Sequence, residues 1–404
     1  MGESPLKDIR IADFSWSVVG PSITTFFSYY GAEVVKVESI HTPEVTRRSA
    51  PFKDNLVGID RSLVFPTLNT NKYSICLNLK HPGGREIALK LAKWADIIVQ
   101  SATDNTLEKL RLNYEDFKTV KKSIIVLNTT SQGQIGPNSN HPGYGDAAVA
   151  MAGFPEVTGW PDREPSLPPG AYTDSVTPWF GALAIMAALE FRNRTGKGQH
   201  IDLSQLEAGA HMLAPAFLVY SANHVVPMRN GNRSASGAPH GVYRCLGDNR
   251  WCAIAVTSED EWKAFCRALG EPRWTKDPKF VTQYSRKKNE DELDDLVESW
   301  TASVTPEEAL QKLQAAGVAS GIVKNIRDLH NDAQLNHRGH FQKVKHPEVG
   351  EYTVELPPAR FSQSAVEVRQ PAPRLGEHTE YVCCSLLGIS AEEFVRLHSE
   401  GIFE

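Results

Sequence analysis

The chain has 404 residues, of which 41% are hydrophobic and 23% charged, and its formal net charge is -5. This composition is typical of a globular protein of about two or three domains, and it excludes a disordered or collagen-like chain. An acidic balance gives no reason to expect nucleic acid as a ligand. No apolar stretch is long enough to span a membrane, and residues 1–10 lack the apolar core of a signal peptide. We therefore expect a cytoplasmic protein without a nucleic-acid or membrane partner.

The first half of the chain alternates short apolar segments with longer amphipathic ones. Predicted strands lie at residues 9–14, 33–37, 74–79, 97–99 and 124–127, with helices up to about residue 30 and over residues 86–94. Alternation at this spacing is typical of a parallel sheet flanked by helices. The predicted fold class is therefore α/β.

Residues 137–170 are rich in Pro, Gly, Asn and Ser, which predicts a long loop. Loops of this length inside a compact domain are usually functional. The loop leads to Asp174, and residues 179–193 are predicted to form a buried helix. Asp174 thus lies near a helix start, where aspartate is a common N-cap residue. The local sequence alone favours this capping role.

The second half changes pattern after another loop, residues 230–241. Further predicted elements are a hairpin around Gly247 and Asp248 and helices at 259–269, 306–316, 379–387 and 391–397. The predicted domains are a large α/β domain (1–225), a smaller α+β domain (226–330) and a C-terminal segment (331–404).

Several catalytic motifs are missing from the sequence. The turn after the first strand carries the single glycine Gly20, whereas a dinucleotide-binding turn needs G-x-G-x-x-G. Phosphate-loop, H-E-x-x-H and G-x-S-x-G motifs are also missing. The six cysteines contain no C-x-x-C pair, and Cys383 and Cys384 are adjacent. We expect neither a metal ion nor a permanently bound cofactor.

Three segments together resemble the class III CoA-transferase family. They are residues 5–38 with their G-P turn and G-A-x-V-x-K-V-E strand, Asp174 followed by L-E at 189–190 and T-G-K-G-Q at 195–199, and P-R-L-G-E-H-T at 373–379. Each segment alone is a weak signal. Three segments in the family's order, spread over nearly the whole chain, are specific.

The resemblance implies an enzyme that moves coenzyme A (CoA) from an acyl-CoA to a small carboxylic acid, with succinyl-CoA as a candidate donor. It also implies that both chain ends build the large domain, that the small domain lies between them in sequence, and that two protomers interlock. Asp174 matches the family's nucleophile. Positions that match CoA-binding residues are Val18, Val19, Leu77, Lys80 and Lys109, and Arg47 is a further candidate.

A carboxylate nucleophile suits this reaction. Attack of Asp174 on an acyl-CoA thioester gives a mixed anhydride, and the released thiolate then converts the aspartyl group into an aspartyl-CoA thioester. An incoming carboxylate reverses these steps, so covalent catalysis divides one hard exchange into easier ones. The CoA thioester is a substrate in this scheme.

Tyr144 matches a position that lines the active site of transferases, where related acyl-CoA racemases carry a histidine base. A tyrosine side chain, whose reference pKa is about 10, is a poor base at neutral pH. Tyr144 therefore favours a substrate-positioning role in a transferase. An acyl-CoA racemase or an intramolecular CoA isomerase on the same scaffold is the alternative.

The sequence departs from the family at residues 100–105, which read Q-S-A-T-D-N in place of the common N-F-R/K/G-P-G stretch that holds the adenosine end of CoA. Ser39 also stands where a basic residue is often found. Weaker nucleotide binding would be compensated if a homologous chain supplied a better site. We therefore expect an interlocked homodimer, with a subunit of a heteromer as the alternative.

Overall fold

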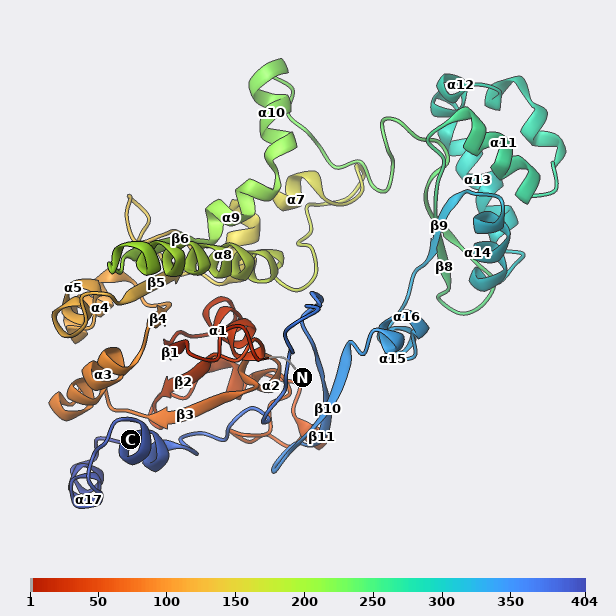
Figure 1. The fold of residues 1–404 in the computed structure, drawn as a ribbon. Helices are drawn as coiled ribbons and strands as arrows, with labels where there is room; N and C mark the ends of the chain where they lie inside the picture. The colour runs from red at the N-terminus through yellow and green to blue at the C-terminus, as the bar shows by residue number, and fades with distance from the viewer. Residues whose placement is uncertain (1–2) are drawn as a thin grey trace. The chain divides into compact units, whose positions relative to one another are not determined.

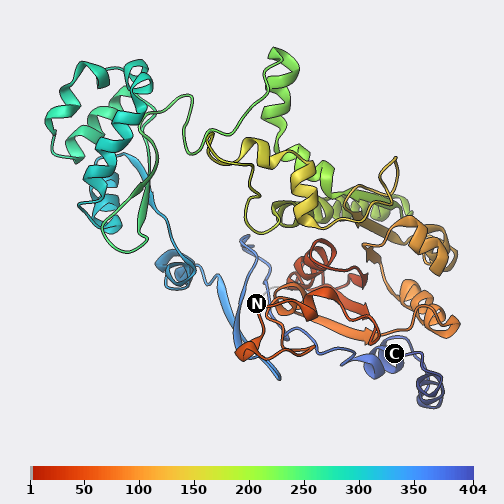
Figure 2. The same ribbon diagram turned by 180° about the vertical axis from the view of Figure 1, so that it is seen from behind.

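The structure is a computed structural model that describes residues 3–404 and divides into two compact units (Figures 1 and 2). Met1 and Gly2, with which the predicted large domain begins, lie outside the described residues. Of the described residues, the large unit comprises 3–155, Leu167–Val226 and Gln334–Glu404, and the small unit comprises Glu156–Ser166 and Pro227–Ala333.

The large unit is built on a six-stranded parallel sheet with the strand order β3-β2-β1-β4-β5-β6. The strands are β1 (Arg10–Phe14), β2 (Glu33–Glu38), β3 (Lys72–Cys76), β4 (Ile97–Gln100), β5 (Ile125–Thr130) and β6 (His200–Ser204). From β1 the strand order runs to β2 and β3 on one side and to β4, β5 and β6 on the other. The order therefore reverses between β1 and β4, which are hydrogen-bonded neighbours. In open α/β sheets such a switch point, at the carboxyl ends of the strands, is where ligands bind.

Helices cover both faces of this sheet (Figure 1). Those in or bordering the large unit are α1 (Val19–Tyr29), α2 (Phe65–Asn69), α3 (Pro82–Trp94), α4 (Asp104–Leu110), α5 (Tyr114–Val120), α6 (Gly145–Met151), α7 (Phe154–Val157), α8 (Tyr172–Thr195), α9 (Gln205–Met212), α10 (Ala214–Asn223), α16 (Ala333–His337) and α17 (Ala391–Ser399). Shorter turns are η1 (Val45–Arg48), η2 (Lys53–Asn55) and η5 (Tyr381–Leu386).

Apolar side chains cover most of both faces of the strands, as expected for a parallel sheet covered on both sides, and the buried Asp13, Lys36 and Lys72 are exceptions. One face packs against α3, α5 and α17 through residues such as Ala12 and Ile98. The other face packs against α1 and α8 through residues such as Ile11 and Val99. Because α17 closes the first of these cores, both chain ends build the large unit, and the α/β prediction is confirmed.

The small unit contains a three-stranded antiparallel sheet, β7 (His240–Arg244), β8 (Trp251–Ala255) and β9 (Ala319–Ile322). Its helices and turns are α11 (Glu259–Ala268), η3 (Arg273–Lys276), η4 (Pro278–Phe280), α12 (Gln283–Lys288), α13 (Glu290–Thr301), α14 (Pro306–Ala315) and α15 (Ile326–His330). Capping boxes begin α11 and α14, where Ser258 and Thr305 bond the backbone three residues on. The predicted hairpin and both predicted amphipathic helices are present.

Three features differ from the sequence-based expectations. Residues 156–166 belong to the small unit, where the Gly231 N–H donates to the Gly159 carbonyl oxygen (2.8 Å). The C-terminal segment, in which the sequence predicts helices alone, also contains a hairpin, β10 (Phe341–His346) and β11 (Gly350–Glu355). The prediction that residues 179–193 form a buried helix is wrong in part, because α8 begins at Tyr172 and exposes large apolar side chains along one face.

Candidate active site

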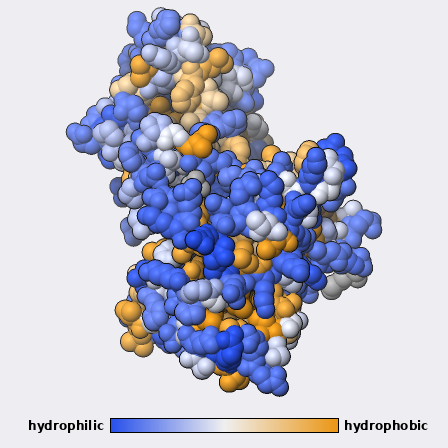
Figure 3. Space-filling model, turned by 90° about the vertical axis from the view of Figure 1, so that its left-hand side faces the viewer, coloured by the Kyte–Doolittle hydropathy of each residue, from blue (hydrophilic) through white to orange (hydrophobic). Residues whose placement is uncertain are grey.

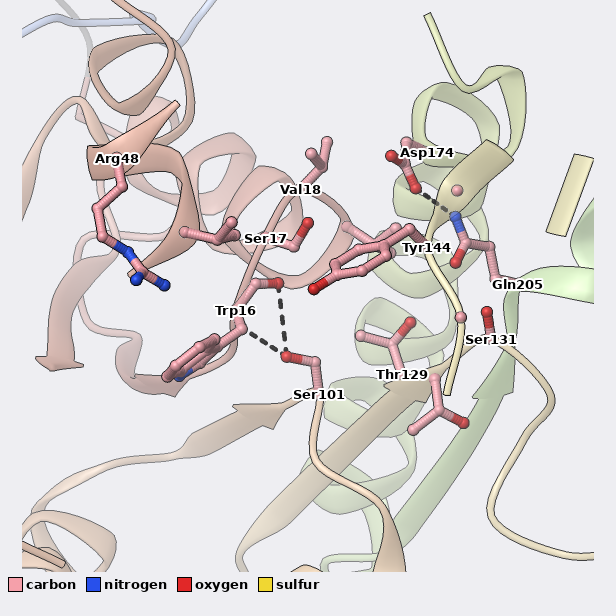
Figure 4. A pocket seen from close by; sticks show the side chains of 15 residues that line it. Trp16, Ser17, Val18, Arg48, Ser101, Thr129, Ser131, Tyr144, Asp174 and Gln205 are labelled. Atoms are coloured by element: carbon pink, nitrogen blue, oxygen red, sulfur yellow. Dashed lines mark hydrogen bonds between the residues drawn. The ribbon is translucent and has the colours of Figure 1, made fainter. Parts of the chain in front are cut away.

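A cavity of about 210 Å³ lies at the carboxyl ends of the sheet strands near the switch point (Figure 4). Trp16, following β1, Ser101, following β4, and Ser131, following β5, line it. Asp174 from α8 and Gln205 from α9 close another side. The topology therefore brings residues that are distant in the sequence to one place.

A second cavity of about 670 Å³ adjoins the first, because Trp16 and Ser101 line both. The Trp16 N–H donates to the Ser101 side-chain oxygen (2.5 Å), which joins the β1 and β4 ends at this border. The ends of β2 and β3 and the apolar side chains Leu107, Leu110 and Leu112 form the other walls. Two adjoining cavities of unequal size suit an elongated ligand that reacts at its narrow end.

A buried charge cluster supports the turn between β1 and α1. Asp13, Lys36 and Lys72 are fully buried, and the Lys72 ammonium donates to the Asp13 carboxylate (3.0 Å) and to the Pro21 carbonyl oxygen (2.9 Å). The Lys36 ammonium donates to the Ser15 carbonyl oxygen (2.7 Å). Burial alone would raise the pKa of Asp13, but the two lysines hold it far below its usual value. The cluster thus fixes the turn that lines both cavities.

Gly20, in the predicted G-P turn, is required by packing. A Cβ atom at this position would lie 2.2 Å from the Ser15 Cβ. The glycine therefore lets α1 approach the β1 end closely. Nearby, Ser17 adopts φ of 64°, and its N–H donates to the Glu44 carboxylate (2.9 Å). Such left-handed conformations cluster at functional sites.

Asp174 lies in the first turn of α8 and is partly buried. The predicted capping role is wrong, because the N-cap residue is Ala171 and no side chain caps this helix. The Asp174 carboxylate accepts a hydrogen bond from Gln205 Nε2 (Figure 4). Its side chain is thus left facing the cavity.

Burial raises the pKa of Asp174 from 3.8 to about 6. The hydrogen bond from Gln205 lowers this pKa, and the nearby charge of Asp146 raises it. The carboxylate is therefore mainly ionised at neutral pH while being more basic than an exposed aspartate. Perturbed carboxyl groups in clefts are typical of functional sites.

Neighbouring residues fix the positions of the Asp174 and Gln205 side chains relative to each other. Gln205 Nε2 also contacts the Thr173 hydroxyl oxygen (3.1 Å), which donates to the Gly145 carbonyl oxygen (3.1 Å). A Cβ atom on Gly145 would lie 2.5 Å from the Asp174 carboxyl atoms, so a larger residue there would displace the Asp174 carboxyl group from its present position. Gln205 was not predicted as a site residue, and its one local signal is its place directly after Ser204, the N-cap residue of α9.

Tyr144 lines the same cavity, and its ring crosses the space between Val18 and Ser131 (Figure 4). The side chain is 72% exposed, and its hydroxyl has no hydrogen-bond partner within residues 3–404. This hydroxyl is therefore free to contact a ligand beside Asp174.

The residues expected to bind CoA are divided between the two cavities. Val18 and Val19 line the smaller cavity, and Leu77 and Lys80 line the larger one. Lys109 is exposed on α4 and lines neither. The divergent residues 100–105 contribute Gln100, Ser101 and Ala102 to the larger cavity, and Ser39 also lines it.

Arg47 is not available for phosphate binding. Its side chain is 1% exposed and donates to both oxygens of Glu38 (2.8 Å each) and to Asp60. Its guanidinium also lies 3.5 Å from the centroid of the Phe65 ring. The next residue, Arg48, is exposed and lines the smaller cavity. Arg48 was not predicted as a site residue, because no motif includes it.

No group of three or more His, Cys, Asp or Glu side chains able to hold a metal ion occurs in the described part of the chain. Within that same part, no helix has the length and apolar character needed to cross a bilayer.

Comparisons of the sequence and the structure with known proteins identify the same protein family. The sequence profile of CoA-transferase family III matches residues 6–379. A probable CoA-transferase of Mycobacterium tuberculosis is 31% identical over 100% of this chain and 51% of its own length, so the chain spans about half of that relative. Succinyl-CoA:glutarate CoA-transferase of Mus musculus is 30% identical over 99% of this chain and 90% of its own length.

Two other relatives are named as subunits of one enzyme. The alpha and beta subunits of succinyl-CoA–L-malate CoA-transferase from Chloroflexus aurantiacus are 29% and 28% identical, each over 98% of this chain and over 87% and 98% of their own lengths. Among solved structures, a CaiB/BaiF family protein from Brucella suis has a TM-score of 0.87 and 28% identity, covering 96% of this chain and 100% of that one. The chain belongs to CoA-transferase family III, a family of enzymes.

Proposed function

We propose that this chain transfers CoA from an acyl-CoA to a small carboxylic acid, with the Asp174 carboxylate as nucleophile and succinyl-CoA as a candidate donor. The observation that carries the proposal is the placement of Asp174 in the smaller of two adjoining cavities at the switch point of the sheet. Its raised pKa, about 6, makes it a better nucleophile than an exposed aspartate and leaves it ionised at pH 7.

The reaction begins when an Asp174 oxygen attacks the thioester carbonyl carbon, the C–S bond breaks, and the CoA thiolate leaves. The thiolate attacks the aspartyl carbonyl carbon of the resulting anhydride, which releases the first acid as a carboxylate and leaves an aspartyl-CoA thioester. The second carboxylate attacks this thioester and expels the thiolate again. The thiolate finally attacks the new acyl group, so acyl-CoA forms and Asp174 is regenerated. No step requires a net proton transfer.

Two of these attacks occur at the Asp174 carbonyl carbon, and the negative charge then develops on an Asp174 oxygen. Gln205 Nε2 already donates to Asp174 Oδ1 and would stabilise that charge without rearrangement. The unpaired N–H groups in the first turn of α6, beside Gly145, are further donors near the carboxyl group. Tyr144 would position the acyl group through its free hydroxyl.

The larger cavity is suited to the rest of the CoA molecule. Leu107, Leu110 and Leu112 supply an apolar wall for the adenine base, and Lys80 supplies a cation for phosphate groups. In this arrangement the pantetheine arm passes Trp16 and Ser101 on its way to Asp174. Within the divergent stretch, Ser101 and Ala102 would then contact CoA through their backbone and small side chains.

We propose a dimer as the working assembly. Trp179, Leu183 and Met186 are 53%, 70% and 44% exposed at a helical spacing on α8. No residue of α10 is buried, although Phe217 and Leu218 lie on it. Exposed apolar helix faces of this kind mark interaction sites. By contrast, hydrophilic side chains predominate on the face shown in Figure 3, where apolar ones gather in separate patches.

The partner in this dimer is a second copy or a homologous chain, as in the alpha and beta subunits of the Chloroflexus enzyme. Purification of this chain alone, followed by measurement of mass and turnover, separates the two assemblies. A dimer with full turnover is expected for the homomer. Rescue of an inactive product by a co-expressed homologue would establish the heteromer.

The function is tested with a panel of acyl-CoA donors and free acids, with the new acyl-CoA quantified by mass spectrometry. Transfer should require both substrates and should be lost by several orders of magnitude in Asp174→Ala. Rearrangement of one acyl-CoA without any free acid would instead indicate an isomerase. Exchange of the α-hydrogen with deuterated water would indicate a racemase.

A further inference from the structure

Arg48 is a cation without a partner in the wall of the Asp174 cavity. It is the last residue of η1, and its side chain is exposed. Across residues 3–404, no ion pair or hydrogen bond involves its guanidinium group. Arg48 and Asp174 are the two charged residues among those that line this cavity. Figure 4 shows them on opposite sides of it, with Tyr144 between them.

The backbone that carries Arg48 is fixed from both sides. The preceding residue, Arg47, is buried in ion pairs with Glu38 and Asp60. On the other side, Glu44 caps η1 and accepts the Ser17 N–H (2.9 Å), which ties η1 to the turn after β1. Two adjacent arginines therefore have opposite surroundings. Arg47 anchors the segment, and Arg48 is presented to the cavity.

A guanidinium group in this position has a specific use. When one carboxyl group of an acid reacts at Asp174, a second carboxylate on the same molecule lies in a cavity whose other charged lining residue is Arg48. Arginine binds carboxylates through two parallel hydrogen bonds, which fixes their orientation as well as their charge. The cavity volume of about 210 Å³ is below the roughly 300–1,000 Å³ typical of pockets for drug-sized ligands, so the acid must be short.

We propose that Arg48 determines substrate specificity by binding the distal carboxylate of a short dicarboxylic acid whose other carboxylate reacts at Asp174. This inference rests on the proposed function of Asp174. The competing use of Arg48 is to bind a phosphate of CoA. Arg48 does not line the larger cavity, which has the volume for the nucleotide.

The test uses acetyl-CoA as donor, because its acyl group has no second carboxylate. Succinate and glutarate are compared as acceptors with butyrate and valerate, which have similar lengths and one carboxylate. Arg48→Met keeps an unbranched, flexible side-chain stem and removes the charged guanidinium group. Lys53→Met removes a nearby cation that lines neither cavity and serves as the matched control.

Arg48→Met should lower kcat/KM for the dicarboxylates about tenfold to a hundredfold, mainly through KM, as expected for loss of a charged hydrogen-bonded pair. It should change kcat/KM for butyrate and the KM of acetyl-CoA less than about threefold. Arg48→Glu should shift preference toward 4-aminobutanoate, which carries a distal ammonium group. Lys53→Met should leave all these values unchanged.

Equal losses for mono- and dicarboxylates, or a raised KM for acetyl-CoA, would assign Arg48 to CoA and overturn the inference. A parent enzyme that shows no preference for dicarboxylates would also overturn it. If the folded parent transfers CoA to no acid of either kind from acetyl-CoA and also from succinyl-CoA, the proposed function itself fails, and this outcome is distinct from the others.

Discussion

Replacement of Asp174 by asparagine should stabilise the folded protein. The stabilisation should occur only at pH values at which the Asp174 carboxyl group of the parent would be ionised. Burial raises the pKa of Asp174 from 3.8 to about 6, which means that folding penalises the charged form. At about 1.36 kcal/mol per pH unit, this difference corresponds to at most about 3 kcal/mol. Because the side chain keeps some solvent contact, screening reduces the expected gain to about 1–2 kcal/mol.

The sign follows from proton linkage. The folded-state pKa lies above the unfolded-state value, so the folded protein binds the proton more tightly. The penalty is absent below about pH 4, grows as the pH rises toward 6, and is complete above that value. Asp174→Asn removes it, because asparagine has nearly the same shape and can still accept the hydrogen bond from Gln205 Nε2.

The assay is urea unfolding of the parent and Asp174→Asn at pH 8 and at pH 5, followed by circular dichroism. The gain in unfolding free energy should be about 1–2 kcal/mol at pH 8 and clearly smaller at pH 5. Asp146→Asn is the control. It keeps the Asp174 carboxylate and removes a nearby charge that raises the pKa of Asp174, so the stability gain should again depend on pH but should be smaller than that of Asp174→Asn. Destabilisation by Asp174→Asn at pH 8, or a gain that does not depend on pH, would refute the reasoning.

Gln205→Leu removes the hydrogen bond that lowers the pKa of Asp174, so the acidic limb of the kcat/KM profile should move above pH 6; an unmoved limb would contradict this role. Tyr144→Phe should reduce turnover about tenfold to a hundredfold without moving that limb, and a loss as complete as that of Asp174→Ala would show that Tyr144 takes part in bond breaking. Leu183→Glu places a charge on the exposed face of α8 and should lower the fraction of dimer that forms on refolding, measured by light scattering; an unchanged fraction would exclude this face from the interface.

The first five strands could be predicted because a parallel sheet covered on both faces imposes continuous apolar runs. β6 was missed, since its pattern H-I-D-L-S alternates and its residues are only partly buried. The hairpin β10–β11 was missed for a similar reason, because Phe341–His346 mixes apolar and charged residues. Burial from one side leaves a weaker signal than burial from both.

The candidate site was only partly predictable. The resemblance identified Asp174 as the nucleophile, whereas the local sequence wrongly predicted a helix cap there. Helix-capping preference alone cannot show that Ala171, with positive φ, occupies the N-cap position. Gln205 and Arg48 carry no motif of their own. They reach the cavity through the order of the strands and the ion pairs of Arg47, which are long-range features.

The central claim is that Asp174 forms the covalent intermediate, and trapping that intermediate tests it most directly. The parent and Asp174→Ala are incubated with acyl-CoA and then with hydroxylamine, which converts activated acyl groups to hydroxamates. Peptide mass spectrometry should locate the modification at Asp174 of the parent and find none in the variant. Modification of a different carboxylate, or activity of Asp174→Ala within about tenfold of the parent, would contradict the account.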